Sequence, residues 1–306
     1  MQKDTISSLL NNLKDPLSEE VREKAEKVSA YETGVLLYGE TGTGKDFWAK
    51  YIHQNSGKEK MLNLNCGDVP ENLLESEWFG YRKGAFTGAD KEYAGRWKLA
   101  ADGIIFLNQI DLLTINMQSR LLRIIERKKY FPLGSPDEYE INSRFLFSAD
   151  DDIEEKVRSG RFRKDLYYRI SAFSIYIPPL RDRKNDILPL FRFFASKKGI
   201  ELKLTRTGEK RLLAHRWDGN IREVENFINN IAVVKNLIED SDTEKLEETS
   251  FSSGTSFPHD DLSLRELEIK YINHLIKKYG NKSKVAAILG ISRKSLYDRI
   301  EKYGKD

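Results

Sequence analysis

The 306-residue sequence predicts an α/β fold: a doubly wound parallel sheet with an α-helical lid, followed by a small all-α C-terminal domain. Three observations predict it. Short apolar runs alternate with helical stretches in the first half of the chain, a helical pattern begins near residue 186, and a glycine-rich loop joins the first apolar run to a helix. The composition, 39% hydrophobic and 32% charged, is typical of a soluble globular protein.

The expected strands are four short apolar runs. The first of them ends on Gly39, as a buried parallel strand does where a loop leaves the sheet. Helical stretches such as Gln118–Arg127 separate the runs, and this alternation is the rhythm of βαβ units. The runs are Val35–Tyr38, Met61–Asn65, Ile104–Leu107 and Arg144–Ser148.

Composition divides the chain into parts. The N-terminal segment is polar and helical, with a helix expected to start at Ser18 because acidic residues follow it in the first turn. Residues 239–261 are acidic, rich in Ser and Thr, and nearly free of large apolar side chains, which predicts a flexible linker. The five expected parts are the helical segment 1–30, the α/β nucleotide-binding subdomain 31–182, the helical lid 183–238, the linker 239–261 and the helical domain 262–306.

The glycine-rich loop Gly39–Lys45 has the design of a phosphate cradle. Backbone N–H groups of such a loop and of the following helix point at phosphate oxygens, and the lysine reaches the β- and γ-phosphates. The general motif continues with Ser or Thr, whereas this chain has Asp46. A glycine-rich turn without a ligand is the alternative, but the strand before it and the helix after it favour the cradle. The expected cofactor-binding residues are Gly39, Glu40, Thr41, Gly42, Thr43, Gly44, Lys45 and Asp46.

Charge is unevenly distributed. The net charge of +3 is too small to predict wholesale binding of polyanions, but residues 263–306 hold eleven Lys or Arg against five Asp or Glu, so 11 − 5 = +6. The single cysteine, Cys66, allows no intrachain disulfide and fits a reducing compartment. The N-terminus opens no apolar run of signal-peptide length, and no stretch is long enough to span a membrane. A cytoplasmic protein without membrane contact is therefore expected.

The basic C-terminal part reads as three helices. Leu264–Lys278 is amphipathic, Asn281 can cap a helix that ends at Gly290, and Ser292 can cap a last helix from Arg293 to about Tyr303. Two short helices around a glycine turn make a helix-turn-helix. The alternative is a helical dimerisation tail. The basic charge and the position of the glycine turn favour DNA binding.

About forty residues after the phosphate loop stands the run Gly84-Ala85-Phe86-Thr87-Gly88-Ala89. Taken alone it is a flexible loop. Inside a nucleotide-binding domain it resembles the GAFTGA element of the NtrC-type AAA+ activators of sigma-54 RNA polymerase, and the resemblance runs from about residue 30 to the C-terminus. It implies an AAA+ P-loop fold, ATP as cofactor, a ring that is a hexamer, and contact of the six residues with sigma-54. Family members often carry an N-terminal receiver or sensing domain, which this sequence is expected to lack.

The resemblance reveals a departure in the second acidic motif. Similar proteins read roughly GTLFLDEIGEL, and this chain reads GIIFLNQIDLL from Gly103. The resemblance places Asn108 where an aspartate would hold magnesium and Gln109 where a glutamate would polarise water. An amide carries no charge and is not a base at neutral pH. Phosphoryl transfer needs charge neutralisation and a positioned water, so the expectation is ATP binding with weak or absent hydrolysis. Mg²⁺ binding is expected to be weakened, and no metal ligand is assured.

Two other acids are candidates to replace the lost groups. Asp111 would share the face of Gln109 if the strand continued that far. Asp150 falls where the family has a sensor asparagine, so its carboxylate would lie near the γ-phosphate. It would then partly compensate for the lost acids or repel the phosphate. The alternative, which we favour, is drift at a site that no longer serves hydrolysis.

Other functional residues match the family pattern. Asn65 aligns with a switch asparagine that pairs with the catalytic glutamate, and it would still form an amide–amide hydrogen bond with Gln109. Arg163 and Arg169, in the run RFRKDLYYRI, resemble arginine fingers that act on the neighbouring subunit's nucleotide, a role suited to a permanently charged guanidinium. Arg222 resembles the lid arginine that senses bound nucleotide.

The C-terminal text AAILGISRKSLYDRIEKYG resembles a Fis-type DNA-binding domain, whose last helix lies in the major groove. Tyr297 is either a core residue or a phosphate contact. The helix Leu264–Lys278 is expected to supply a dimer interface. The candidate DNA-binding residues are Arg293, Lys294, Ser295, Tyr297 and Arg299.

The expected function is regulation of sigma-54 polymerase from DNA upstream of promoters, in a ring of this chain or of this chain with a related AAA+ subunit. The alternative is a non-hydrolysing, DNA-binding pseudo-ATPase that modulates active relatives. A AAA+ unfoldase is a third reading, which the helix-turn-helix and the Gly84–Ala89 run disfavour. Whether the chain is an enzyme therefore depends on residues 108 and 109.

Overall fold

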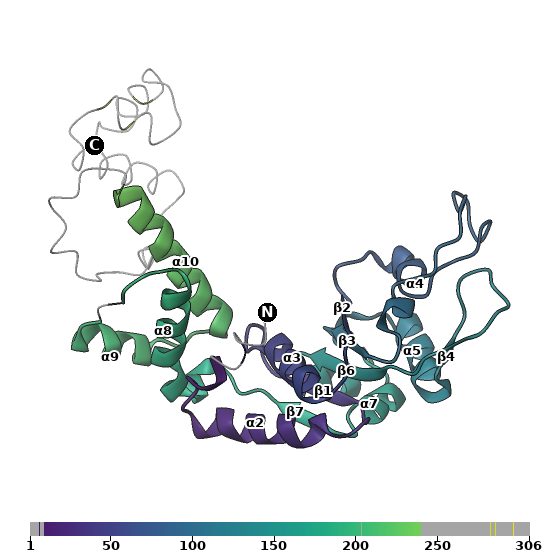
Figure 1. Ribbon diagram of the computed structural model, residues 1–306, viewed down its shortest axis with the longest axis horizontal. Coiled ribbons are helices and arrows are strands. Elements are labelled where there is room, and N and C mark those ends of the chain that lie inside the picture. The colour runs from purple at the N-terminus through teal and green to yellow at the C-terminus, as the bar shows by residue number, and fades with distance from the viewer. Residues whose placement is uncertain are drawn as a thin grey trace. The chain divides into compact units, whose positions relative to one another are not determined.

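Figure 1 shows the computed structural model of the chain, which describes residues 6, 9–202 and 204–239, together with 282, 285 and 296. The chain divides into two compact units, Met1–Thr243 and Glu244–Asp306. The first unit holds a sheet, the helices that cover it and a helical lid. In the second unit the three described residues are helical, and Val285 and Leu296 are buried.

A five-stranded parallel sheet forms the centre of the first unit, in the order β2-β3-β6-β1-β7. The four predicted strands are confirmed, and two of them are one residue longer than predicted. The fifth strand was not predicted, because it lies at the sheet edge and its residues alternate between exposed and buried. The strands are β1 (Val35–Tyr38), β2 (Met61–Asn65), β3 (Ile104–Asn108), β6 (Arg144–Ala149) and β7 (Ser174–Tyr176).

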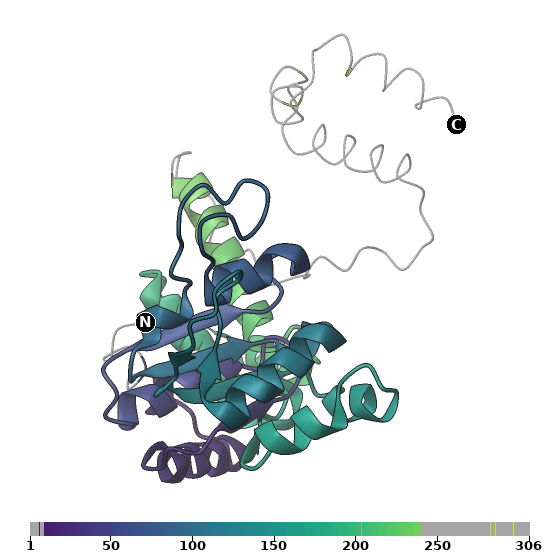
Figure 2. The same cartoon turned by 90° about the vertical axis from the view of Figure 1, so that its right-hand side faces the viewer.

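Helices cover both faces of this sheet, as Figure 2 shows. Leu36, Ile105 and Phe147 pack into one core with α4, α5 and α7, while Leu37 and Phe106 pack into a second core with α2 and α3. Neighbouring strand residues thus point to opposite faces, and the predicted doubly wound arrangement is confirmed. The covering helices are α2 (Pro16–Ser29), α3 (Lys45–Asn55), α4 (Glu71–Phe79), α5 (Ile115–Arg127), α6 (Ile153–Arg158) and α7 (Lys164–Ile170).

The lid has a hydrophobic core of its own. Phe191 and Trp217 pack edge to face with ring centroids 5.2 Å apart, and Leu190 and Val224 are fully buried beside them. The predicted helical region beyond residue 186 corresponds to α8 (Ile187–Lys197), α9 (Arg206–Ala214) and α10 (Asn220–Glu239), which follow the short 3-10 helices η3 (Leu180–Asp182) and η4 (Lys184–Asp186).

The start of α2 differs from the prediction. The helix begins at Pro16, and the N-cap is Asp15, whose carboxylate accepts a hydrogen bond of 3.1 Å from the amide of Leu17. Proline suits the first helical position because it has no N–H to leave unpaired there. Ser18 lies inside the helix instead, and its hydroxyl donates to buried Asp186.

Small elements complete the first unit. They are the 3-10 helices η1 (Trp97–Ala100) and η2 (Ile110–Leu112) and an antiparallel pair of two-residue strands, β4 (Lys129–Tyr130) and β5 (Tyr139–Glu140). No helix in the described ranges is long and apolar enough to cross a membrane.

Candidate functional site

The phosphate loop leaves β1 at the carboxyl edge of the sheet and leads directly into α3. Gly42 and Gly44 have φ of +81° and +103°, which glycine adopts at low cost. No side chain caps the N-terminus of α3, and the backbone N–H groups of Gly44, Lys45 and Asp46 donate to no partner among the described residues. Uncommitted amides at a helix N-terminus form a site for phosphate oxygens.

Lys45 is the central cation of this loop, and its side chain is only 9% exposed. Its Nζ donates to the backbone oxygens of Gly39 and Glu40, the latter at 3.1 Å, and to Oδ1 of Asp150 at 2.9 Å. Asp150 also accepts from the hydroxyl of Thr41 at 3.2 and 3.3 Å. The carboxylate that the resemblance places near the γ-phosphate is therefore hydrogen-bonded to two side chains of the phosphate loop.

Glu40 joins the loop to the lid. Arg181 donates to both of its carboxylate oxygens, and the hydrogen bond from Arg181 holds the pKa of Glu40 below its usual range. Asn220, at the start of α10, donates to Glu40 at 3.2 Å and to the backbone oxygen of Thr41 at 3.1 Å. Its own oxygen accepts from the amide of Leu180 at 2.7 Å, so one buried amide ties three segments together.

The N-terminal turn of α10 lies against the phosphate loop. The amide of Ile221 donates to the backbone oxygen of Gly42 at 3.0 Å. A Cβ on Gly42 would lie 2.4 Å from the oxygen of Gly219 and 3.3 Å from Cβ of Arg222, so the close approach requires glycine. Arg222 is exposed, and its charge favours the ionised form of Asp46. This is the lid position that the resemblance implies, and its contact with nucleotide stays a prediction.

Asn108 ends β3 and lies between two polar side chains. Its oxygen accepts from the hydroxyl of Ser148 on neighbouring β6, and its amide helps to stabilise the ionised form of Asp46. Burial raises the pKa of Asp46, while the charges of Lys50 and Lys45 partly offset that effect. The hydroxyl of Ser148 thus holds the side chain of Asn108 at the end of β3.

Gln109 departs from regular strand geometry. Its φ of +58° is left-handed, and its backbone N–H donates to Ser148 at 3.0 Å. The predicted amide–amide hydrogen bond with Asn65 is not formed among the described contacts. Asn65 donates to Asp68 at 2.8 Å and accepts from the amide of Gly67 at 3.0 Å, which satisfies its side chain locally.

The condition under which Asp111 would share the face of Gln109 is not met. The strand stops at Asn108, and Asp111 lies in η2 with only 2% of its side chain exposed. It pairs with Lys156 at 2.6 Å. A carboxylate that is buried against a lysine is a structural ion pair, which makes Asp111 a poor substitute for the missing base.

The two candidate arginine fingers lie on α7 and at its start. Arg163 forms a two-pronged ion pair with Asp165, at 3.0 and 2.7 Å, and donates to Ser119 of α5 at 2.9 Å. Arg169 is exposed, and its charge lowers the pKa of Lys128, although burial of that lysine contributes more. Both guanidinium groups are at the surface, as a group that acts on a neighbouring subunit would be.

The run Gly84–Ala89 forms a turned loop. Gly84 and Gly88 have φ of +82° and +96°, and the amide of Gly84 donates to the oxygen of Ala89 at 2.8 Å, which closes the loop. Phe86 is 45% exposed, and its ring lies edge-on to Tyr81 with centroids 4.9 Å apart. Thr87 is exposed beside it.

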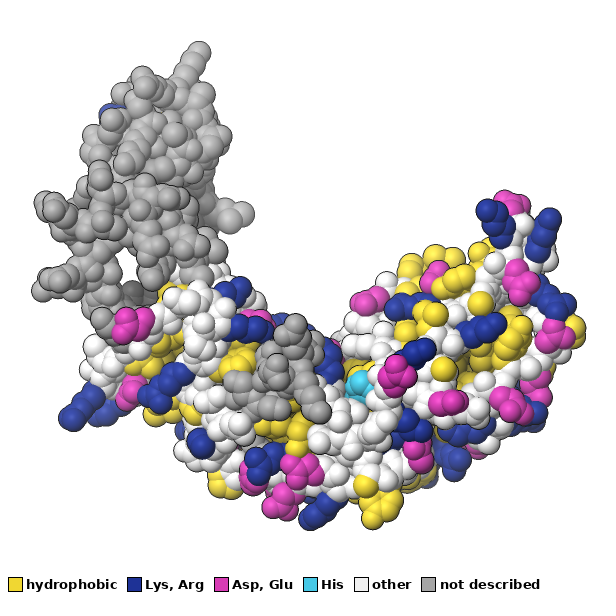
Figure 3. Space-filling model, viewed as in Figure 1, with side chains coloured by type: hydrophobic (Ala, Val, Ile, Leu, Met, Phe, Trp, Pro, Cys, Tyr) yellow, Lys and Arg dark blue, Asp and Glu magenta, His cyan; other side chains and the backbone are white. Residues whose placement is uncertain are grey.

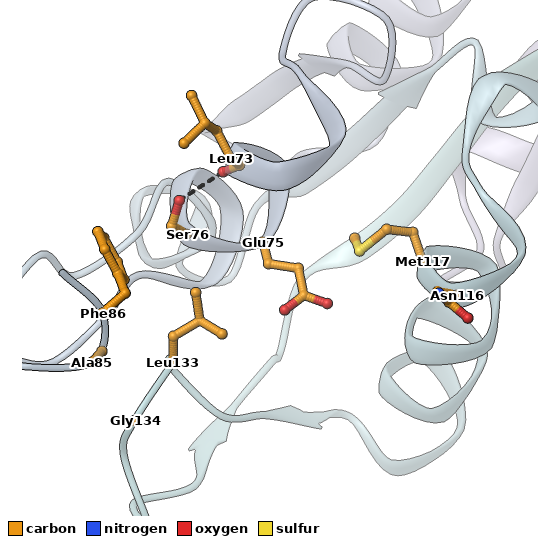
Figure 4. Close-up of a pocket in the computed structure, with 9 residues that line it drawn as sticks. All are labelled: Leu73, Glu75, Ser76, Ala85, Phe86, Asn116, Met117, Leu133 and Gly134. Carbon is orange, nitrogen blue, oxygen red and sulfur yellow. Dashed lines mark hydrogen bonds between the residues drawn. The ribbon is translucent and has the colours of Figure 1, made fainter.

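A cavity of about 880 Å³ opens beside this loop, and Figure 4 shows its walls. Phe86 and Ala85 form one side and Leu133 lies near them, while Met117 and Asn116 of α5 lie across the opening. Hydrophobic side chains gather over the part of the molecule that holds α4 and α5 (Figure 3). Exposed apolar side chains there include those of Leu73, Ile115 and Phe131.

The candidate DNA-binding residues Arg293, Lys294, Ser295, Tyr297 and Arg299 lie outside the described residues. The same is true of the predicted linker and of the first C-terminal helix. Their roles stay predictions.

Several polar partners were not predicted from sequence. Ser148 holds Asn108 and the amide of Gln109, and Arg181 with Asn220 connects the loop to the lid. The parallel pairing of β3 and β6 places Ser148 beside Asn108, but that pairing is visible only once the strand order is known. An asparagine after Asp218-Gly219 was the available signal for Asn220, since asparagine tolerates the left-handed φ of +53° found there.

Three families of sequences match the chain. Residues 12–176 match the sigma-54 interaction domain, 181–256 the AAA+ ATPase lid domain and 263–303 the bacterial regulatory protein Fis family. The transcriptional regulatory protein FlbD of Caulobacter vibrioides is 32% identical, over 95% of this chain and 70% of its own. The regulatory protein LuxO of Vibrio cholerae is 41% identical over 67% and 40%, and the Nif-specific regulatory protein of Klebsiella pneumoniae is 38% identical over 72% and 43%. The chain thus spans less than half the length of the latter two relatives.

Solved structures share the fold. NtrX of Brucella abortus in complex with ATP matches with a TM-score of 0.69 at 24% identity, over 94% of this chain and 67% of its own. The Hsp104–ADP complex of S. cerevisiae matches with a TM-score of 0.51 at 14% identity, over 73% and 46%. At these identities the likeness concerns the fold.

Proposed function

Because the chain belongs to the family of sigma-54-dependent transcriptional regulators with AAA+ and Fis-type domains, we propose that it binds ATP and DNA and contacts sigma-54 polymerase, with hydrolysis weak or absent. One observation carries the proposal. A phosphate loop with uncommitted amides lies beside a strand end at which both expected carboxylates are the amides Asn108 and Gln109.

The residues of the loop fit a nucleotide. The N–H groups of Gly44, Lys45 and Asp46 are available to phosphate oxygens, and Arg222 lies on the lid side of the same loop. ATP supplies a transferable phosphoryl group when it is bound. This chain's own residues hold the phosphates of ATP, and the contacts of α10 with the loop couple phosphate binding to the lid.

The set of residues that would hold a metal ion and activate the attacking water is incomplete. Asp46 and Asn108 are the side chains that would hold a magnesium ion, and an amide is a weaker partner for Mg²⁺ than the carboxylate of the family pattern. Gln109 can orient a water by hydrogen bonding but cannot take its proton. Binding without brisk turnover is the behaviour that this set of residues supports.

The Gly84–Ala89 loop supports contact with sigma-54. A half-exposed aromatic ring at a loop tip, beside a cavity whose walls are partly apolar, suits a segment of a partner that carries apolar side chains. Phe86→Ala is expected to leave folding intact and to abolish association with sigma-54 in a pull-down. Tyr31→Ala, which removes a 66% exposed aromatic elsewhere, is the matched control and is expected to bind normally.

A second candidate is a pseudo-ATPase that works in a mixed ring. Arg163 and Arg169, which would serve a neighbour's nucleotide, are retained at the surface, whereas Asn108 and Gln109, which would serve this chain's own, are altered. A subunit that completes the site of a competent relative would keep the first pair without needing the second.

Steady-state ATPase assays test both candidates. The purified chain is expected to bind labelled ATP, to lose binding in Lys45→Ala, and to show little turnover alone. Higher turnover when it is mixed with a catalytically competent relative, lost in Arg163→Ala with Arg169→Ala, would select the mixed ring. Equal ATP affinity in the wild type and Lys45→Ala would refute the proposed nucleotide site.

A further inference from the structure

Asp150 is held beside the phosphate loop by the sheet itself. Tyr38 of β1 pairs with Ala149 of β6 in parallel register, so Gly39 and Asp150 are the next residues on adjacent strands at the carboxyl edge. The backbone of Asp150 is therefore positioned by the end of β6, next to the start of the loop, and its side chain is 34% exposed.

The ammonium group of Lys45 has all of its donors committed. An ammonium has three N–H bonds, and the three acceptors around Nζ are the backbone oxygens of Gly39 and Glu40 and the carboxylate of Asp150. Two of these acceptors are neutral and one is charged. A phosphate that binds Lys45 must replace one or more of them, and the anionic partner at 2.9 Å costs the most to replace.

The inner and the outermost phosphates of a nucleoside triphosphate would meet different groups in this site. In a phosphate loop the backbone amides hold the α- and β-phosphates, and the lysine reaches the β- and γ-phosphates, so the γ-phosphate depends on the lysine more than the β-phosphate does. The uncommitted amides of Gly44, Lys45 and Asp46 serve the inner phosphates. The outermost phosphate of a triphosphate would approach Lys45 where Asp150 already lies, and two anions that share one cation repel each other.

Neither the end of β3 nor Glu40 offsets this repulsion. Asn108 and Gln109 are neutral, so they contribute no carboxylate with which to attract a metal ion. The carboxylate of Glu40 is already paired with Arg181. Among the described residues, Asp150 is the acid that touches the lysine of the loop.

We propose that the carboxylate of Asp150 lies where the terminal phosphate of a nucleoside triphosphate would bind. The site therefore binds nucleoside diphosphate more tightly than nucleoside triphosphate. The inference rests on the proposed nucleotide site. It adds a specificity-determining residue to it. Such a subunit stays bound to the diphosphate. It binds the triphosphate only when Asp150 is displaced from Lys45.

Titration of the full-length chain with fluorescently labelled ADP and ATP tests the proposal, in magnesium and in EDTA. The wild type is expected to bind ADP at least tenfold more tightly than ATP under both conditions. Asp150→Asn is expected to raise ATP affinity at least tenfold, about 1.4 kcal/mol, and to change ADP affinity less than threefold. Asp151→Asn is the matched control, because it removes the same charge one residue away at an exposed position, and it is expected to keep the wild-type ratio.

Other outcomes distinguish failure of the inference about Asp150 from failure of the proposed nucleotide site. If Asp150→Asn leaves the ADP-to-ATP ratio unchanged while both nucleotides bind, the inference is wrong and the nucleotide site stands. If Asp150→Asn weakens ATP only in magnesium, Asp150 is a metal ligand and not a phosphate mimic. If neither nucleotide binds the wild type or Asp150→Asn, the proposed nucleotide site fails as well.

Discussion

At Asp46 a carboxylate stands where most phosphate loops have a hydroxyl, and it lies half-buried against the amide of Asn108. Burial raises the pKa of Asp46, and the charges of Lys50, Lys45 and Arg222 only partly offset that effect. The folded chain therefore holds a proton on Asp46 more tightly than the unfolded chain does. The ionised form costs stability at neutral pH.

This cost in unfolding free energy depends on pH. Above the raised pKa, Asp46 is ionised in both states and lowers the stability of the fold; below the ordinary value of 3.8 it is protonated in both states and the cost disappears. Asp46→Asn is therefore expected to be more stable than the wild type at pH 7 and similar to it near pH 3.5. Urea unfolding at a series of pH values measures the difference. A wild type that is the more stable at pH 7 would mean that the nearby lysines outweigh burial.

Among the elements, the central strands β3, β6 and β1 were predictable because most of their residues are apolar and buried. β7 was not, since an edge strand of three residues with one buried side chain presents no such run. The contacts within the candidate nucleotide site were likewise not predictable from local sequence. Sequence placed Asp150 near the phosphates, but its ion pair with Lys45 depends on the register between β1 and β6, which no local pattern encodes.

Asn220 is the residue on which the junction between loop and lid most depends. Asn220→Ala would leave the amide of Leu180 and the oxygen of Thr41 without their partner and would place alanine at a φ of +53°. The expected loss is about 2–4 kcal/mol of unfolding free energy. Urea denaturation measures it.

Asn230→Ala provides the control for this measurement, because it makes the same change at an exposed position of α10 and is expected to cost less than about 0.5 kcal/mol. Equal stabilities of the two variants would show that the buried amide does not hold the lid.

At the scale of the whole molecule, the two compact units differ in content. The first holds the complete sheet, both of its cores and the lid, so it contains what a nucleotide site needs. The second contains the Fis-family match and the surplus of positive charge. The sequence predicts a boundary in this part of the chain because the composition of residues 239–261 differs sharply from that of the lid.

Removal of the second unit is expected to separate the two functions. A chain that ends at residue 240 should stay folded and bind nucleotide, but lose specific DNA binding in fluorescence anisotropy. Within the full chain, Arg293→Ala or Arg299→Ala is expected to weaken binding, by about 1–3 kcal/mol if the arginine contacts a base. Unchanged DNA affinity after truncation would place the DNA site in the first unit instead.

The central claim is that this chain binds ATP but hydrolyses it slowly or not at all, and a steady-state ATPase assay tests it most directly. The decisive variant restores the two carboxylates that the family pattern has at positions 108 and 109. Each lost catalytic group typically costs a factor of about 10² or more, so the wild type should turn over ATP slowly or not at all. Asn108→Asp with Gln109→Glu, measured with and without Asp150→Asn, is expected to raise steady-state ATPase turnover above the wild type. A brisk wild-type rate that is lost in Asp150→Asn would contradict the account, because it would mean that a relocated carboxylate performs the chemistry.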